Sequence, residues 1–321
     1  TAGHITNEEG RQLIHAIQSQ LGFERIEFHA GVSYRNLMIY RAPSPQGKAG
    51  PLPDWLRRFQ ESRGIDAKKA DGLEHPPFTS ETLTIPPHDV PDQPAVDHLP
   101  SGPGSELLRW LMQEGAEILR DQAVNRARHA AGKHPANAIW LWGQGQAPRL
   151  RTFADQRGLK GAILSAVDLV RGVGMLAGWD RVDVPGATGY LDTDYAAKGR
   201  HGAQALADHD IVCVHIEAPD EASHEGRAEA KVEAIEQIDR HIVGPLRKAL
   251  ESYGSWRMLV SPDHSTLLRT RAHDRAPVPW AMAGTGLAAS GHPYDEISAQ
   301  AAGGPFLSEG YRLMDAFLAS A

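Results

Sequence analysis

The sequence predicts an α/β protein in which helices cover both faces of a largely parallel sheet, preceded by a smaller α+β region. Short runs of β-branched residues alternate with amphipathic helical stretches in the second half of the chain, a pattern typical of parallel strands joined by crossover helices. With 321 residues, the chain is long enough for two domains. We therefore predict an α+β domain over residues 1–137 and a three-layer α/β domain over residues 138–321.

The composition is that of a globular protein that works in water. Apolar residues make up 41% of the chain, the mean hydropathy is −0.39, and no apolar run approaches the ~18 residues of a membrane span. A net charge of −7 argues against a nucleic-acid surface. No signal peptide is apparent, and the single cysteine, Cys213, has no partner in the chain. We expect a cytoplasmic enzyme without nucleic-acid or membrane partners.

The amino-terminal region predicts helices and a hairpin. A capping box at residues 6–9 starts a helix over 7–21, where apolar residues recur at helical spacing. Two β-rich runs, 26–28 and 32–40, predict a hairpin that places Arg35 on a sheet face.

Proline is concentrated between residues 42 and 105, so regular structure there should be limited to a helix at about 53–62. A long amphipathic helix is predicted over 104–130, with cationic residues clustered at its end. In the second domain, strands are predicted at 138–142, 160–165, 211–216, 256–260 and 278–283, and helices at 167–178, 195–208, 232–246 and 307–317.

Two predicted strands each end at a proline and are followed by metal-ligand residues. Asp220 and His224 follow the strand at 211–216, and Asp263 and His264 follow the strand at 256–260. The carboxyl ends of strands in an open α/β sheet form its ligand site, so these side chains should converge there, together with His273. Carboxylate and imidazole donors without thiolates suit Mn²⁺ or Zn²⁺, and five such residues are enough for two ions.

Four stretches, in this order, resemble motifs of the archaeal-type, cofactor-independent phosphoglycerate mutases of the alkaline phosphatase superfamily. They are Pro-Gly-Ala-Thr-Gly-Tyr-Leu-Asp-Thr-Asp at 185–194, Val-His-Ile-Glu-Ala-Pro-Asp-Glu-Ala-Ser-His-Glu-Gly at 214–226, Ser-Pro-Asp-His-Ser-Thr at 261–266 and Ala-His-Asp-Arg-Ala-Pro-Val-Pro-Trp at 272–280. The resemblance extends over about residues 1–285. It implies an alkaline-phosphatase-like three-layer sheet domain with an inserted α+β substrate domain.

The resemblance also implies a reaction and a division of the metal ligands. Such enzymes interconvert 3-phosphoglycerate and 2-phosphoglycerate through a phosphoserine, with one ion held here by Asp220, His224 and His273. A second ion would take Asp263 and His264, completed by an aspartate and a nucleophilic serine from an earlier segment of the fold. That segment has no match in this sequence, so the resemblance implies an incomplete second site and an isolated chain without mutase activity.

The remaining site predictions concern phosphate binding, and each has a plainer alternative. Lys160 is the candidate catalytic cation, although a lysine at a strand edge can equally be a solvated surface residue. The candidate substrate ligands are His4, Arg35, His88 and Arg128. The plainer interpretations are solvated side chains, a turn histidine, and a cation that complements a helix macrodipole.

Two other functions stay open at this point. The chain could be a related phosphomonoester hydrolase or homoserine kinase-like phosphotransferase of the same superfamily, which assays with a panel of phosphate esters would identify. It could also be a non-catalytic fragment stabilised by metal. Absence of turnover after the missing segment is restored would indicate that third function.

Overall fold

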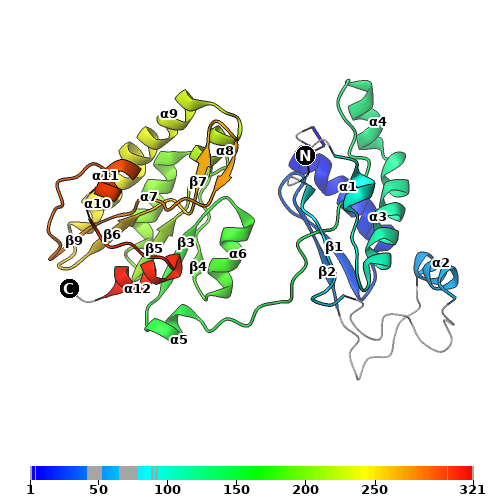
Figure 1. Cartoon of the computed structure of the whole chain (residues 1–321), viewed down its shortest axis with the longest axis horizontal. Coiled ribbons are helices and arrows are strands. Elements are labelled where there is room, and N and C mark those ends of the chain that lie inside the picture. Colours follow the sequence, from blue (N-terminus) through cyan, green and yellow to red (C-terminus); the bar gives the residue numbers. More distant parts are fainter. Residues whose placement is uncertain are drawn as a thin grey trace. The chain divides into compact units, whose positions relative to one another are not determined.

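The computed structural model describes residues 2–3, 5–41, 53–64, 78–87, 90, 93–301 and 303–319. His4 and His88, two of the proposed substrate ligands, lie outside the described residues. The chain divides into two compact units, Thr1–Ala147 and Pro148–Ala321 (Figure 1). Residues 138–147, which the sequence pattern assigns to the second domain, therefore belong to the first unit.

The first unit is built on a helix packed against a hairpin. Helix α1 (Asn7–Leu21) begins at the predicted capping box, in which Thr6 and Glu9 exchange hydrogen bonds. Its apolar side packs on the antiparallel strands β1 (Ile26–Ala30) and β2 (Asn36–Tyr40). Ile17, Leu21 and Ile26 are fully buried at this contact, so the helical spacing of apolar residues correctly predicted the core.

The hairpin loop is longer than predicted, and it contains Arg35. Ser33 has a left-handed backbone conformation, with φ 55°, and it lies outside both strands. Its backbone N–H donates to Asn7 Oδ1 at the start of α1, at 2.8 Å. Because of this conformation and this hydrogen bond, the second strand begins only at Asn36. Arg35 therefore lies in the exposed loop rather than on the sheet face, with its guanidinium 5.5 Å from the Tyr34 ring centre.

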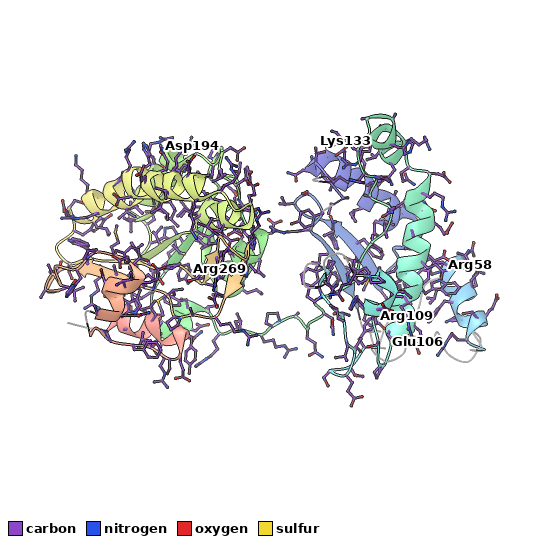
Figure 2. All side chains as sticks on the ribbon, turned by 45° about the horizontal axis from the view of Figure 1, so that its top comes forward. Arg58, Glu106, Arg109, Lys133, Asp194 and Arg269 are labelled. Atoms are coloured by element: carbon purple, nitrogen blue, oxygen red, sulfur yellow. The ribbon has the colours of Figure 1, made fainter. Side chains whose placement is uncertain are left out.

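Helices α2 (Asp54–Ser62) and α3 (Ser105–Arg120) contact each other and carry ion pairs. Arg58 pairs with Glu114 at 2.5 Å and Arg63 with Glu106 at 3.4 Å; Figure 2 labels Arg58 and Glu106 on these helices. A short 3-10 turn, Ala95–His98, lies between them in sequence.

The helix predicted over 104–130 is two helices. α3 ends at Arg120 and α4 (Ala123–Ala130) starts after a break. Buried Asn125 explains the break, because its side-chain amide donates to Leu119 O at 2.7 Å and to Ala136 O at 2.8 Å. A polar side chain that satisfies the last carbonyls of a helix favours termination there.

The strand predicted at 138–142 is absent, and the structure describes all of these residues. They instead line the first unit through side chains. Ile139 and Leu141 pack on its core, and Trp140 Nε1 donates to Ile85 O at 2.8 Å. A single extended segment bound by side-chain contacts does not form the backbone ladder of a sheet.

The second unit contains the predicted parallel sheet, in the order β4-β3-β5. Its strands are β3 (Gly161–Leu164), β4 (Asp180–Arg181) and β5 (Ile211–Val214). Helix α6 (Asp168–Leu176) connects β3 to β4, and α7 (Tyr195–Ala205) connects β4 to β5. Because these two crossovers run in opposite directions along the sheet, right-handed connections place α6 and α7 on opposite faces, which gives three layers.

Gly174 allows α6 to pack closely on β3, since a β-carbon there would lie 2.8 Å from Ile163 Cγ2. Helix α7 begins at Asp194, whose carboxylate accepts from Ala197 N at 2.7 Å. A short helix, α5 (Phe153–Arg157), precedes the sheet.

The rest of the predicted parallel sheet is antiparallel. Strands β6 (Arg257–Val260) and β9 (Ala281–Gly284) pair antiparallel, and so do β7 (Ser265–Leu267) and β8 (Ala272–Asp274). Parallel pairing requires a crossover connection, usually a helix. The hairpin β7–β8 occupies the connection between β6 and β9, so β9 returns in the opposite direction.

Asp220 and His224 lie on α8 (Ala218–His224). The other helical elements that follow in the second unit are α9 (Ala228–Ile238), the π-helical segment Asp239–Val243, α10 (Gly244–Leu250), α11 (Glu296–Ala301), a 3-10 turn Gly310–Arg312 and α12 (Leu313–Leu318). The apolar stripe predicted from Val232 is only partly buried. Ile242, in the π-helical segment that packs against α7, is 3% exposed, whereas Val232 on α9 is 57% exposed. Within the described residues, no helix has both the length and the apolar character needed to cross a bilayer.

Candidate metal centre

Asp220 and His224 project from the same side of α8. The helix starts after β5, with Pro219 in its first turn, and the two ligand residues are one turn apart. His224 Nε2 lies 3.2 Å from Asp220 Oδ2. The four-residue spacing therefore brings the two donors together, as predicted, on the short helix that follows the strand.

The β7–β8 hairpin brings the other predicted ligands to this pair. His273 Nε2 lies 3.1 Å from His224 Nε2 and 3.6 Å from Asp220 Oδ1. The His264 and His273 rings are 3.8 Å apart between centres. Asp220, His264 and His273 each offer one ligand atom, and all three atoms lie within 4.8 Å of one another.

Asp263 completes the set at its exposed side. Its carboxylate is 79% exposed and lies 3.5 Å from His264 Nε2. All five residues predicted as metal ligands are therefore brought together, with His273 between His224 and His264.

The hydrogen bonds around the cluster suit a divalent cation. His224 Nδ1 lies 2.8 Å from Arg271 O, and a carbonyl can only accept, so Nδ1 carries the proton. The unprotonated Nε2 then faces His273 and Asp220, where a cation would find a lone pair and a carboxylate. Imidazole and carboxylate donors of this kind fit Zn²⁺ or Mn²⁺.

A tight turn fixes the position of the Arg271 carbonyl. Arg271 has φ 55°, a left-handed conformation that is uncommon for a residue with a side chain, and its N–H donates to Leu267 O at 2.7 Å. The turn of the β7–β8 hairpin thus orients His224 from across the site.

His273 is held in the form that binds metals. Its pKa is lowered by partial burial first, and then by the neighbouring imidazoles of His264 and His224, against the opposing effect of Asp220. A neutral imidazole has the free lone pair that a cation needs, so fewer protons compete for this ligand.

Lys160 is not brought to this cluster. Lys160 precedes β3, at the amino end of that strand, whereas the predicted ligands follow the carboxyl ends of their strands. Because β3 and β5 run parallel, Lys160 lies at the opposite end of the strands from the ligand pair that follows β5. Four residues of strand separate the edges by roughly 13 Å. Lys160 Nζ instead lies 3.2 Å from Asp180 Oδ2, and its N–H donates to Asp210 Oδ2 at 2.8 Å.

A polar group that the sequence analysis missed lies at the correct edge. Ser165 follows β3 and His215 follows β5, and Ser165 Oγ lies 3.1 Å from His215 Nδ1. His215 Nε2 lies 3.3 Å from Glu217 Oε2, just before α8. Residues at the carboxyl ends of neighbouring parallel strands meet at one edge of the sheet. The positions of Ser165 and His215 at the ends of two predicted strands were therefore the signal that could have found this pair.

Lys198 was also missed, and it gives the motif at 185–194 a structural role. It is 1% exposed and donates to His215 O at 3.2 Å and to Thr188 O at 3.5 Å. Burial lowers the pKa of Lys198 to about 8, although Glu217 opposes the shift. The ammonium thus connects the loop at 185–194 to the end of β5.

Arg128, a proposed phosphate ligand, is buried in the first unit. It is 2% exposed and pairs with Glu9 Oε2 at 2.9 Å. Its other nitrogens donate to His134 O at 2.9 Å and to the carbonyls of Ala2 and Gly3. These contacts tie α4 to the first residues of the chain.

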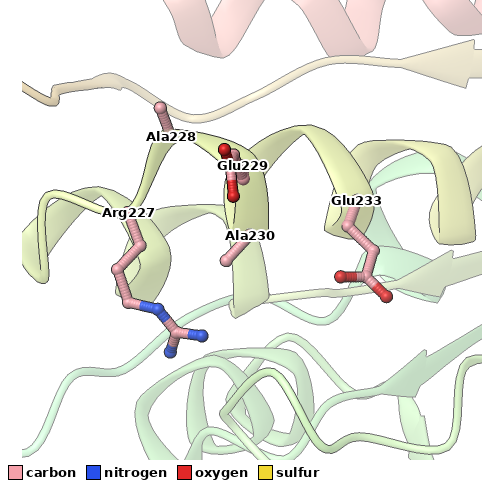
Figure 3. Close-up of a pocket in the computed structure, with 5 residues that line it drawn as sticks. All are labelled: Arg227, Ala228, Glu229, Ala230 and Glu233. Carbon is pink, nitrogen blue, oxygen red and sulfur yellow. The ribbon is translucent and has the colours of Figure 1, made fainter.

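A shallow pocket lies beside the carboxyl end of α8, at the start of α9. Arg227, Ala228, Glu229, Ala230 and Glu233 line it, and Figure 3 shows Arg227 and Glu233 extending from the same side of the chain. Arg227 pairs with Glu225 at 3.0 Å, so its charge is already balanced. None of the five predicted metal ligands lines this pocket.

Comparisons with known proteins show the family of the chain. The family model described as the metalloenzyme superfamily matches residues 61–305. A probable 2,3-bisphosphoglycerate-independent phosphoglycerate mutase of Geobacter sulfurreducens is 42% identical over 99% of this chain and 71% of its own length. The 2,3-bisphosphoglycerate-independent phosphoglycerate mutase of Methanothrix thermoacetophila is 41% identical over 94% of this chain and 68% of its own length.

Two solved structures share the fold. The PH0037 protein from Pyrococcus horikoshii superposes with a TM-score of 0.66 at 22% identity, covering 94% of this chain and 66% of that one. The cofactor-independent phosphoglycerate mutase from Thermoplasma acidophilum superposes with a TM-score of 0.53 at 22% identity, covering 99% and 70%. The family model and the sequence identity to these relatives show that the chain belongs to the metalloenzyme superfamily and, within it, to the 2,3-bisphosphoglycerate-independent phosphoglycerate mutases.

Proposed function

We propose that this chain carries the metal centre of an enzyme that interconverts 3-phosphoglycerate and 2-phosphoglycerate by phosphoryl transfer through a serine. One observation carries the proposal. Asp220, His224, His264 and His273 converge from a helix and a hairpin far apart in sequence, in a chain 42% identical to a relative named for this reaction.

The proposed centre holds two divalent ions, Mn²⁺ or Zn²⁺. Asp220, His224 and His273 would hold one, and Asp263 and His264 would contribute to the other. When bound, such ions lower the pKa of an attacking hydroxyl and neutralise charge on the phosphoryl oxygens.

The protein's own contribution is to orient these donors before substrate arrives. The Arg271 carbonyl fixes His224 with Nε2 toward Asp220, and partial burial keeps His273 neutral. Ligands held in one orientation lose little conformational entropy when the centre assembles.

Substrate binding is assigned to the first unit. Arg35 is exposed in its loop and offers a guanidinium suited to a phosphate or carboxylate, together with His4 and His88. For Arg128 we propose an indirect contribution, because its donors hold Glu9 and the carbonyls just before residue 4.

We further propose that the serine nucleophile and a further metal aspartate come from a segment that these 321 residues do not include. The chain spans 71% of the Geobacter relative and 68% of the Methanothrix one, which is compatible with that division. Lys160 has no part in the proposed centre, because it precedes β3 at the other end of the strands and pairs with Asp180 there. A reducing, cytoplasmic setting is proposed because Cys213 has no second cysteine with which to pair.

The test is an enolase-coupled and ³¹P NMR assay of the protein expressed from its complete natural reading frame, with Mn²⁺. We expect interconversion of the two phosphoglycerates, lost by at least about a thousandfold in His224→Ala because a ligand is removed. His292→Ala, an exposed histidine of the same unit, serves as the matched control and should stay active. Release of inorganic phosphate without isomerisation would instead indicate the hydrolase alternative.

A further inference from the structure

Thr266 lies at the centre of the ligand cluster, although its own hydroxyl is not among the predicted metal ligands. It is 5% exposed, and its position in the β7–β8 hairpin places it directly opposite His273. Its hydroxyl contacts Asp220 Oδ1 and lies 3.3 Å from His264 Nδ1. Thr266 is therefore next to ligands assigned to both metal ions.

The direction of these hydrogen bonds follows from the chemistry of the groups. An ionised carboxylate can only accept, so the single hydroxyl proton of Thr266 goes to Asp220. The hydroxyl oxygen then has a lone pair left for His264, whose Nδ1 must carry a proton to donate to it.

This proton assignment decides how His264 faces the cluster. With Nδ1 protonated, the neutral ring leaves Nε2 as a bare lone pair, 3.5 Å from the Asp263 carboxylate. A lone pair and a carboxylate repel each other unless a cation lies with them. At the same time, the bond to Asp220 Oδ1 leaves Oδ2 facing His224.

The backbone of Thr266 is held from the other side. The ammonium group of Lys231, on α9, donates a hydrogen bond to Thr266 O at 3.1 Å. Thr266 also pairs with His273 across the hairpin. The hydroxyl thus starts from a fixed backbone, which is what an orienting residue requires.

We infer that Thr266 is a positioning residue that couples the two metal sites, its hydroxyl orienting Asp220 and fixing the Nδ1–H tautomer of His264 at once. The assignment of Asp220 and His264 to different ions rests on the proposed function; the hydrogen bonds do not. Outer hydrogen-bond partners of metal ligands typically contribute about 10–100-fold in metal affinity.

The test compares Thr266→Val, which keeps the shape and removes the hydroxyl, with Thr266→Ser, which keeps the hydroxyl. Calorimetric titration of the 321-residue chain with Zn²⁺ should show affinity about 10–100-fold weaker in Thr266→Val and within about threefold of wild type in Thr266→Ser. Long-range ¹H–¹⁵N NMR should show the Nδ1–H tautomer of His264 in wild type and Thr266→Ser, and a mixture of tautomers in Thr266→Val.

Equal Zn²⁺ affinity in wild type and Thr266→Val would overturn the inference, as would an Nε2–H tautomer of His264 in the wild-type protein. Urea unfolding without metal shows whether Thr266→Val folds; if it does not, the wild-type tautomer and the Thr266→Ser affinity still decide the question. No mutase assay enters this test, so a failure of the proposed reaction and a failure of the role of Thr266 give separate results.

Discussion

The Nε2 atoms of His224 and His273 lie 3.1 Å apart, although 49 positions separate the two residues in sequence. His224 Nδ1 is bound to the Arg271 carbonyl, so the facing nitrogens can share at most one proton between neutral rings. A second proton would place two imidazolium charges in contact. The pair therefore favours either a shared hydrogen bond or a cation.

This relationship predicts an acid-sensitive site in the metal-free protein. The pKa of His273 is lowered from its usual 6.5, so below that pH the unfolded chain binds the proton more readily than the folded chain. Stability should then fall as the pH is lowered from about 7 to 5, since it is lost where the unfolded state binds more protons. His273→Gln removes the titrating group, and urea unfolding in EDTA should show wild type losing more stability than this variant over the window. An equal pH dependence in the two proteins would contradict the prediction.

Lys198 predicts a second rise of stability with pH, in the alkaline range. Burial lowers its pKa to about 8 from 10.5, so between these values the unfolded chain binds the proton and the folded chain does not. Stability should rise with pH through that window. Compared with Lys198→Met, wild type should gain on the order of 1–2 kcal/mol between pH 7.5 and 9.5, measured by urea unfolding. A constant difference between the two proteins would contradict the prediction, since it would mean that Lys198 stays protonated in the folded chain, as it does in the unfolded chain.

Replacing Arg128 should lower the free energy of unfolding, because its side chain is buried and hydrogen-bonded within the first unit. Its replacement by glutamine leaves Glu9 and the carbonyls of Ala2, Gly3 and His134 without their donor in a buried site. Breaking a buried ion pair typically costs about 3–5 kcal/mol, and we expect Arg128→Gln to fall near the lower end because Glu9 is partly exposed. Arg126→Gln, an exposed neighbour on α4, is the control and should change stability by less than about 0.5 kcal/mol. A fully stable Arg128→Gln protein with weakened substrate binding would support the phosphate-ligand role instead.

Local patterns predicted the elements that depend on local interactions. The capping box and apolar spacing gave the bounds of α1, and the apolar runs predicted strands at β3 and β5, which the structure pairs in parallel. The break before α4 could not be predicted, because Asn125 acts through Ala136, a contact made only in the folded chain. The antiparallel return of β9 likewise depends on where the preceding hairpin folds.

The convergence of the proposed ligands was predictable because their donors are recognisable side chains at characteristic spacing. Asp220 and His224 are visible as an i, i+4 pair, His273 follows the second strand's Asp-His pair, and the family resemblance supplied the division of these residues between two ions. The groups that orient them were not predictable. The side chain of Thr266 is uncharged, and the acceptor of the hydrogen bond from His224 Nδ1 is the backbone carbonyl of Arg271. Lys160 shows the reverse, since its charge suggested catalysis while its place before β3 puts it at the other edge of the sheet.

Calorimetric titration of the 321-residue chain with Mn²⁺ or Zn²⁺ tests the central claim most directly. Wild type should bind at least one tight equivalent through Asp220, His224 and His273, and a second, weaker equivalent at Asp263 and His264. His224→Ala should lose the tight equivalent, together with the thermal stabilisation by metal that binding to the folded state provides. The exposed-residue control His292→Ala should retain both. Equally tight binding by wild type and His224→Ala would contradict the assignment of this cluster as the metal centre.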